Sequence, residues 1–260
     1  MRAGVAKQSL KASAIAAWFW LVIAVASATE VSRREIDVAT PTGPVAMEAY
    51  ERQGQESRPA IVVLSGSKGF GSAAYGEMAQ AFNAAGLDVF LLHVLSRQDV
   101  RAIAGADGAA ARKRYYAQRL PDWIASARAA VALLKARPRH AGRVGLLGIS
   151  LGANVAAASA ADNADIAALV LADGGFPEGY SRPVRALPPL HLIWGGADRV
   201  FPLSLGRDLE RMARGLGGTA SLDVYEGAGH DFFLRPGTSQ ARAAHQSAAD
   251  FLQRRLAQRP

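Results

Sequence analysis

The ten residues "LLGISLGANV", Leu146–Val155, place a serine between two glycines where one residue pattern changes into another. A strand-like apolar run precedes Ser150, and a run of small, helix-compatible residues follows it. A tight strand-to-helix turn is expected to strain Ser150 and lift its hydroxyl above the sheet, while Gly148 and Gly152 let neighbouring backbone approach closely. The stretch therefore predicts a nucleophilic serine. The alternative is a glycine-bracketed turn whose serine caps the helix.

Strand-like and helix-like segments alternate along the rest of the chain. Short apolar runs of strand type cover 58–66, 86–94, 142–148, 166–175, 188–196 and 220–227, after an antiparallel hairpin over 35–51. Helical patterns cover 73–85, 120–138, 151–161, 202–216 and 239–256, with Pro121 expected in the first turn of its helix. This alternation predicts an α/β fold whose mostly parallel sheet has helices on both faces. Ligands in such folds bind beyond the carboxyl ends of the strands.

Two further polar side chains follow strands of the predicted sheet. Asp198 lies after the strand in "HLIWGGADRVFP", and His230 lies after the strand in "VYEGAGHDFF". A serine hydroxyl needs a base and the base needs an orienting acid, so both side chains are expected beside Ser150 as a catalytic triad. Asp173, after "ALVLA", is the substitute acid. Asp231 adjoins the histidine and is poorly placed to receive its ring hydrogen.

The same reasoning predicts which backbone groups hold the oxyanion of the transition state. One N–H comes from Leu151, directly after the serine and at the start of the following helix. The second comes from the glycine-rich loop "LSGSKGFGS", where Ser67 is favoured and Lys68 is the next choice. The alternative is a flexible strand-to-helix loop without this role.

Composition excludes several other kinds of site. The chain has no cysteine, which rules out disulfides, thiolate metal sites and a cysteine nucleophile. Its five histidines form no H-x-x-H or H-x-x-x-H pair, so no metal site is predicted. The formal net charge is +8, but the basic residues are scattered without a lysine-rich run, so nucleic acid is not an expected partner.

The first 28 residues differ in composition from the rest. Arg2, Lys7 and Lys11 precede the uninterrupted apolar run "AIAAWFWLVIAVA" and the small residues "ASA" at 26–28. This order is typical of a secretory signal peptide, and the run is shorter than the ~20 residues of a membrane span. We expect cleavage after residue 28, one mature domain over 29–260, and export to a periplasm or beyond the cell. The alternative is an uncleaved inner-membrane anchor over 12–29.

Five stretches together resemble the dienelactone hydrolase family of α/β-hydrolases, over most of residues 30–256. They are "VVLSGSKG", "LPDWIASARAAVALLKARP", "RVGLLGISLGANVA", "IWGGADRVFP" and "YEGAGHDF". The resemblance implies hydrolysis of a small-molecule ester or lactone through an acyl-enzyme, with no metal and no organic cofactor. The namesake enzymes have a cysteine where this chain has Ser150, and an activating glutamate at the position that Gly66 matches. Both departures weaken the case for dienelactone itself as the substrate.

The resemblance also implies a substrate-binding arginine. Arg97, in "HVLSRQ", matches the family's arginine that holds a substrate carboxylate. Residues 97–120 and the loop "GYSRPVRALPP" are basic, which favours an anionic acyl or leaving group. A solvated surface helix is the alternative for the first segment. Lys68 is a further candidate for binding substrate. Phe176 is expected to line the acyl side of the pocket, although such a residue is more often part of a core.

Three functions fit these residues. The first is a serine hydrolase of the carboxylic ester type, in which Ser150 attacks, His230 carries the proton and Asp198 orients the imidazole. The second is acyl transfer or thioester cleavage by the same triad. The third is a non-catalytic homologue that binds a ligand, which a complete triad argues against.

Overall fold

The computed structural model describes Met1 and residues 31–54, 56–140 and 143–257. The predicted signal peptide over 1–28 and the alternative anchor over 12–29 lie outside these residues, apart from Met1. Within the described ranges, no helix has both the length and the apolar composition needed to cross a bilayer.

One eight-stranded sheet runs through the described residues in the order β1-β2-β4-β3-β5-β6-β7-β8. The strands are β1 (Val31–Val38), β2 (Val45–Arg52), β3 (Ala60–Leu64), β4 (Asp88–Leu92), β5 (Val144–Ile149), β6 (Ala168–Ala172), β7 (Leu190–Gly195) and β8 (Ala220–Tyr225). The pairs β1–β2 and β2–β4 are antiparallel, and every other pair is parallel. The predicted opening hairpin and mostly parallel sheet are therefore confirmed.

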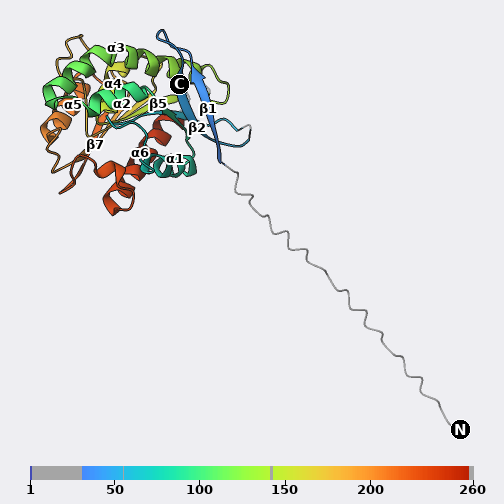
Figure 1. Cartoon of the computed structure of the whole chain (residues 1–260). Helices are drawn as coiled ribbons and strands as arrows, with labels where there is room; N and C mark the ends of the chain where they lie inside the picture. Colours follow the sequence, from blue (N-terminus) through green and yellow to red (C-terminus); the bar gives the residue numbers. More distant parts are fainter. Residues whose placement is uncertain (2–30, 55, 141–142, 258–260) are drawn as a thin grey trace.

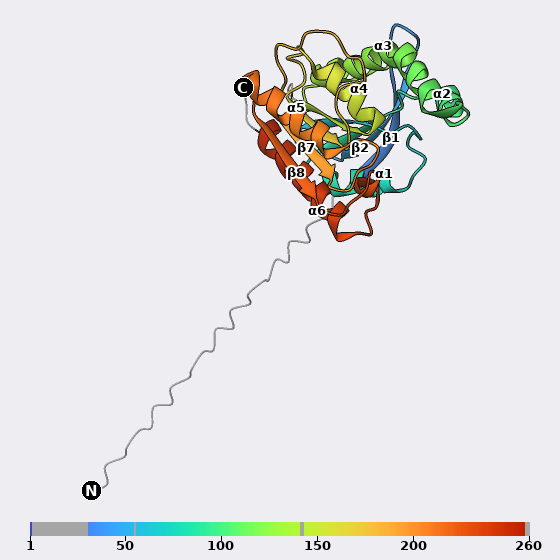
Figure 2. The same cartoon turned by 90° about the vertical axis from the view of Figure 1, so that its left-hand side faces the viewer.

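Helices cover both faces of this sheet. They are α1 (Ala74–Ala84), α2 (Arg97–Ala104), α3 (Gly108–Lys135), α4 (Leu151–Ala160), α5 (Leu203–Gly215) and α6 (Ser239–Ala257), with a short 3₁₀ helix, η1 (Phe232–Leu234). Buried residues of α3, α4 and α5 join one hydrophobic core, and those of α1 and α6 join a second core on the other face. Figures 1 and 2 show α3 and α4 on one side of the sheet and α1 and α6 on the other.

Burial on both faces explains why the central strands are continuously apolar. In β3, Val62 and Leu64 pack into the core beneath α3 and α4, whereas Ile61 and Val63 pack into the core beneath α1 and α6. Successive side chains of a strand point to opposite faces, so a strand covered on both sides has no solvent-facing position. Each such side chain contributes ~1.5–3 kcal/mol when fully buried. The central strands thus form a fixed platform for the loops at their carboxyl ends.

The structure corrects the start of helix α3. Its predicted start near Pro121 is wrong, because α3 already begins at Gly108 and Pro121 lies inside it. Alanine and arginine are abundant in the preceding segment and both favour helix. Proline cannot donate a hydrogen bond to the carbonyl of Ala117, but Ala117 and Pro121 are both exposed, so that carbonyl can face water.

Candidate active site

Ser150 lies at the turn between β5 and α4 with a strained backbone. Its φ and ψ are 54° and −114°, a conformation that residues with a side chain rarely adopt. The Ser150 N–H donates to the carbonyl of Ala172 at the end of β6, 3.0 Å away, which ties the turn to the neighbouring strand. A Cβ at Gly148 would lie 2.4 Å from the Gly152 oxygen, and one at Gly152 would lie 2.2 Å from the Leu64 oxygen. Glycine is therefore required at both positions, as predicted.

His230 and Asp198 meet Ser150 at this turn. The Ser150 Oγ lies 2.8 Å from His230 Nε2, and His230 Nδ1 lies 2.8 Å from Asp198 Oδ2. If Nδ1–H donates to the carboxylate, Nε2 is left as an acceptor for the serine proton. The second oxygen of Asp198 accepts the N–H groups of Val200 and Phe201, at 2.7 and 3.0 Å. The three residues predicted from separate loops thus form one continuous chain of hydrogen bonds.

The surroundings of His230 restrict its movement without closing the site. The Phe201 ring lies over the imidazole, with 5.5 Å between ring centroids and 31° between ring planes. The Asp198 side chain is fully buried, whereas 16% of the His230 side chain remains exposed. Because a buried carboxylate is poorly hydrated, its interaction with the imidazole is stronger than it would be in water. The exposed part of His230 leaves access from solvent.

The loop after β3 passes directly beside the nucleophile. A Cβ at Gly66 would lie 3.7 Å from the Ser150 Cβ, and the Gly66 N–H donates to the Tyr75 hydroxyl over 3.0 Å. That N–H is already engaged, which favours the neighbouring Ser67 as the oxyanion donor on this loop. Ser67 and Leu151 stay predictions in this role. No sequence motif marks Tyr75 as part of this site. Burial raises the pKa of its hydroxyl to about 12, so the hydroxyl is neutral at physiological pH.

Asp173, the predicted substitute acid, lies next to the triad without bonding to the histidine. It follows β6 directly and is completely buried. Its Oδ1 accepts the Gly195 N–H over 2.8 Å, and burial raises the pKa of its carboxyl to about 8. His230 pairs with Asp198 instead. The structure therefore favours Asp198 over Asp173 as the orienting acid.

Among the described residues, two groups of side chains have the composition of a metal site, and most of their potential ligand atoms already have partners; Asp173 Oδ2 and His140 Nε2 lack a hydrogen-bond partner. The groups are Asp173, Asp198 and His230, and Glu51, Asp88 and His140. In the first, the histidine nitrogens contact Ser150 and Asp198. In the second, the carboxylates are bound by the guanidinium groups of Arg34, Arg58 and Arg139. Cationic neighbours oppose a metal ion in the second group, and in the first group the histidine is engaged by the hydrogen bonds of the triad.

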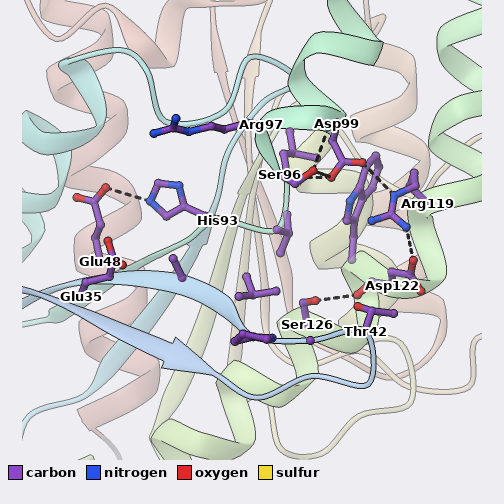
Figure 3. Close-up of a pocket in the computed structure, with 17 residues that line it drawn as sticks. Glu35, Thr42, Glu48, His93, Ser96, Arg97, Asp99, Arg119, Asp122 and Ser126 are labelled. Atoms are coloured by element: carbon purple, nitrogen blue, oxygen red, sulfur yellow. Dashed lines mark hydrogen bonds and ion pairs between the residues drawn. The ribbon is translucent and has the colours of Figure 1, made fainter.

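A cavity of about 500 Å³ lies between the hairpin and helices α2 and α3 (Figure 3). Arg97 lines it, and in Figure 3 its side chain extends away from the cluster formed by Ser96, Asp99 and Arg119. None of the triad residues is among its lining residues. Arg119 is held by Asp99 and Asp122, so part of the basic charge predicted for this segment is neutralised.

The other predicted substrate contacts lie in different surroundings. Lys68 is exposed on the loop after β3. Phe176 is half-buried against the core and lies beside the Tyr180 ring, with 4.7 Å between centroids. The Asn154 side chain of α4 donates to the carbonyl of Gly175, which ties the Phe176 loop to the helix that follows the serine. These positions stay predictions for substrate binding.

Comparison with known proteins shows which family the chain matches. The dienelactone hydrolase family matches residues 47–256. A dienelactone hydrolase from Anabaena variabilis superposes with a TM-score of 0.68 at 18% identity, covering 87% of this chain and 99% of the other. An esterase from Pyrobaculum calidifontis gives 0.67 at 16%, covering 85% of each chain, and carboxyl esterase 2 from Tuber melanosporum gives 0.68 at 16%, covering 89% of each. No curated protein matches the chain. At these identities the structural likeness establishes the α/β-hydrolase fold.

Proposed function

Because the chain belongs to the dienelactone hydrolase family, we propose that it hydrolyses a carboxylic ester or lactone through an acyl-enzyme formed on Ser150. The observation that carries the proposal is the continuous chain from Ser150 Oγ through His230 to Asp198, with two contacts of 2.8 Å. A serine hydroxyl on a strained turn, a base within reach of it and a buried acid behind the base are the parts of a nucleophilic hydrolase.

The first half of the reaction forms the acyl-enzyme. Ser150 Oγ attacks the carbonyl carbon while His230 Nε2 takes the hydroxyl proton. The negative charge that develops on the carbonyl oxygen is held by the N–H groups of Leu151 and Ser67. The resulting imidazolium is stabilised by Asp198 and then gives its proton to the leaving alcohol, so that the C–O bond of the ester breaks.

The second half uses water and the same groups. His230 takes a proton from a water molecule as the water attacks the acyl carbon, and the bond to Ser150 Oγ breaks as the serine regains its proton. The free acid leaves. The same triad could transfer the acyl group to another acceptor or cleave a thioester; the family match favours hydrolysis.

The test of this function is esterase activity in matched variants. We expect the wild type to hydrolyse p-nitrophenyl acetate, and Ser150→Ala and His230→Ala each to lose at least ~10³-fold of this activity, because neither variant can form the activated nucleophile. Circular dichroism and urea unfolding would show that both variants stay folded. Undiminished hydrolysis in either folded variant would reject the proposed triad.

We also propose that the substrate carries an anionic group near Arg97. Support comes from the exposed position of Arg97 at the start of α2. Among the described residues, no carboxylate forms an ion pair with its guanidinium group, which leaves that group available to a substrate. Arg97→Ala should raise KM for esters with a carboxylate several-fold more than for neutral esters, since only the former lose a charge-assisted contact. Arg101→Ala, an exposed arginine of the same helix, is the control. Equal KM changes for both ester classes would reject the anionic substrate.

Export is proposed from the sequence pattern alone. A basic start, an apolar run and small residues at 26–28 support a cleaved signal peptide. On this proposal the hydrolase acts on substrates outside the cytoplasm.

A further inference from the structure

Asp173 is a buried acid that the proposed reaction does not use. It is completely buried directly after β6, and its φ is 47°, one of the few positive values at a residue with a side chain in the described chain. Its N–H donates to the Ile193 carbonyl, and its Oδ1 accepts the Gly195 N–H. Gly195 in turn accepts a hydrogen bond from the Asp198 N–H over 3.1 Å. Asp173 is thus tied to the turn that carries the acid of the triad.

The second oxygen of this carboxyl is unsatisfied. Asp173 Oδ2 is buried and has no hydrogen-bond partner among the described residues. An asparagine of the same shape could accept the Gly195 N–H equally well, so the fold alone does not require an acid at this position. A buried ionisable group that packing does not require is a candidate for a functional role.

The charged groups around Asp173 are mostly acidic. One carboxyl oxygen of Asp173 lies within 4.8 Å of both a carboxylate oxygen of Asp198 and a ring nitrogen of His230. Asp231, in the loop after β8, also raises the pKa of Asp173. Two carboxylates this close in a water-poor site do not both ionise readily, and the pKa of Asp173 is accordingly raised to about 8, mainly by burial. At neutral pH the Asp173 carboxyl group is therefore mostly neutral.

We propose that Asp173 is a second acid of the active site, a positioning residue that acts through His230: when the charge of Asp198 is removed, the nearby carboxylate of Asp173 stabilises the protonated His230 in its place. This inference rests on the proposed function, since it assigns Asp173 a part in the same proton transfer. The proton that Asp173 loses goes to solvent, and no other group is consumed.

The inference predicts an unusual pH profile for Asp198→Asn. Removing the charge of Asp198 removes one cause of the raised pKa of Asp173, so Asp173 should ionise below pH 8 in this variant. Loss of a triad acid typically costs ~10⁴ in kcat. We expect Asp198→Asn to lose only ~10²–10³ at pH 8, with residual activity that rises with pH as Asp173 ionises. Asp198→Asn/Asp173→Asn should lose this rise and be at least ~10-fold slower than Asp198→Asn alone.

A second readout does not depend on activity. Folded Asp173 keeps its proton up to pH of about 8, whereas the unfolded chain loses it near the ordinary value of 3.8. Between these values unfolding releases a proton, so the contribution of Asp173 to stability falls as the pH rises. The midpoint of thermal unfolding of Asp173→Asn should therefore rise relative to that of the wild type from pH 5 to about 8, and the difference should be constant above that pH.

The experiment compares wild type, Asp198→Asn, Asp173→Asn and the double variant in p-nitrophenyl acetate hydrolysis and thermal unfolding from pH 5 to 9, with the Ser150→Ala rate subtracted. Asp165→Asn, placed in the Asp198→Asn background, is the control, because Asp165 is an exposed carboxylate before the start of β6, whereas Asp173 follows the end of that strand. Equal pH profiles for the Asp198→Asn and double variants would overturn the inference, as would a difference in unfolding midpoint between Asp173→Asn and the wild type that does not change between pH 5 and 8. A wild type that hydrolyses no ester would instead contradict the proposed function. The inference about Asp173 is tested separately, by the differences between the variants.

Discussion

At the scale of single residues, Ser150 shows how the site is held in a conformation that the chain would otherwise avoid. A positive φ at a residue with a side chain costs ~1–3 kcal/mol, and it persists only where the surroundings fix it. Here the hydrogen bond from the Ser150 N–H to Ala172 and the close approach of Leu64 at Gly152 fix it from two sides. The strain aims the hydroxyl at His230 rather than into the helix.

This account predicts a large effect of Gly152→Ala. The added methyl group would lie 2.2 Å from the Leu64 carbonyl oxygen and 2.6 Å from the Ser65 carbonyl oxygen, and backbone cannot move aside as a flexible side chain does. We expect the free energy of unfolding, measured with urea, to fall by ~3 kcal/mol or more, at the upper end of overpacking costs. Gly71→Ala is the matched control, since nothing lies within 4 Å of a Cβ there and its φ is not positive.

A change of less than ~0.5 kcal/mol is expected for that control, as for surface substitutions in general. Similar stability losses in the two variants would show that close backbone approach at Gly152 does not hold the turn together.

The residues of the triad could be predicted because each follows a strand, and parallel strands end at one edge. The contact between Tyr75 and Gly66 could not, because it depends on how helix α1 packs beside the loop after β3, which no local pattern encodes. For a similar reason the sequence favours Asp198 as the acid of the triad but keeps Asp173 as a substitute. Both follow neighbouring strands, and only the distances to His230 Nδ1 separate them.

At the scale of secondary-structure elements, the buried strands were the easiest to predict. Their apolar runs are continuous because both faces are covered, and β5 extends only a residue beyond its predicted end. Helix α2 is not predicted as a separate element, although Ser96 and Asp99 form a capping box that can be read in "SRQD". Helix α3 begins earlier than predicted, because an exposed proline can lie inside a long helix without leaving a buried carbonyl unpaired.

Ion pairs between charged side chains also connect strands and loops that are distant in the sequence, and no sequence pattern predicts these pairs. Asp88 at the start of β4 is completely buried and binds both Arg58 and Arg139. Glu51 near the end of β2 binds Arg34, and its Oε1 lies 3.6 Å from Arg137 Nη1. Buried carboxylates need such partners, since an unpaired buried charge is strongly destabilising. Which arginine pairs with which carboxylate depends on the packed arrangement of distant segments.

At the scale of the whole molecule, the two edges of the sheet have different roles. The amino-terminal edge of the parallel strands carries the buried arginine–carboxylate contacts around Asp88, which hold segments together. The carboxyl edge carries Ser150, Asp198, His230 and the N-terminus of α4, where polar groups face one another across loops. The fold class and this placement followed from the alternation of strands and helices. The identity of the substrate depends on loop surfaces, where packing does not dictate the sequence.

The measurement that tests the central claim most directly is the site of covalent modification by a fluorophosphonate. The reagent reacts with a serine only when a base activates it, so it reports the assembled chain from Ser150 through His230 to Asp198. Peptide mapping by mass spectrometry should find one phosphonyl group on Ser150 in the wild type and none in Ser150→Ala or His230→Ala. A folded wild-type protein that stays unmodified, or carries the group on another residue such as Ser67, would contradict the account.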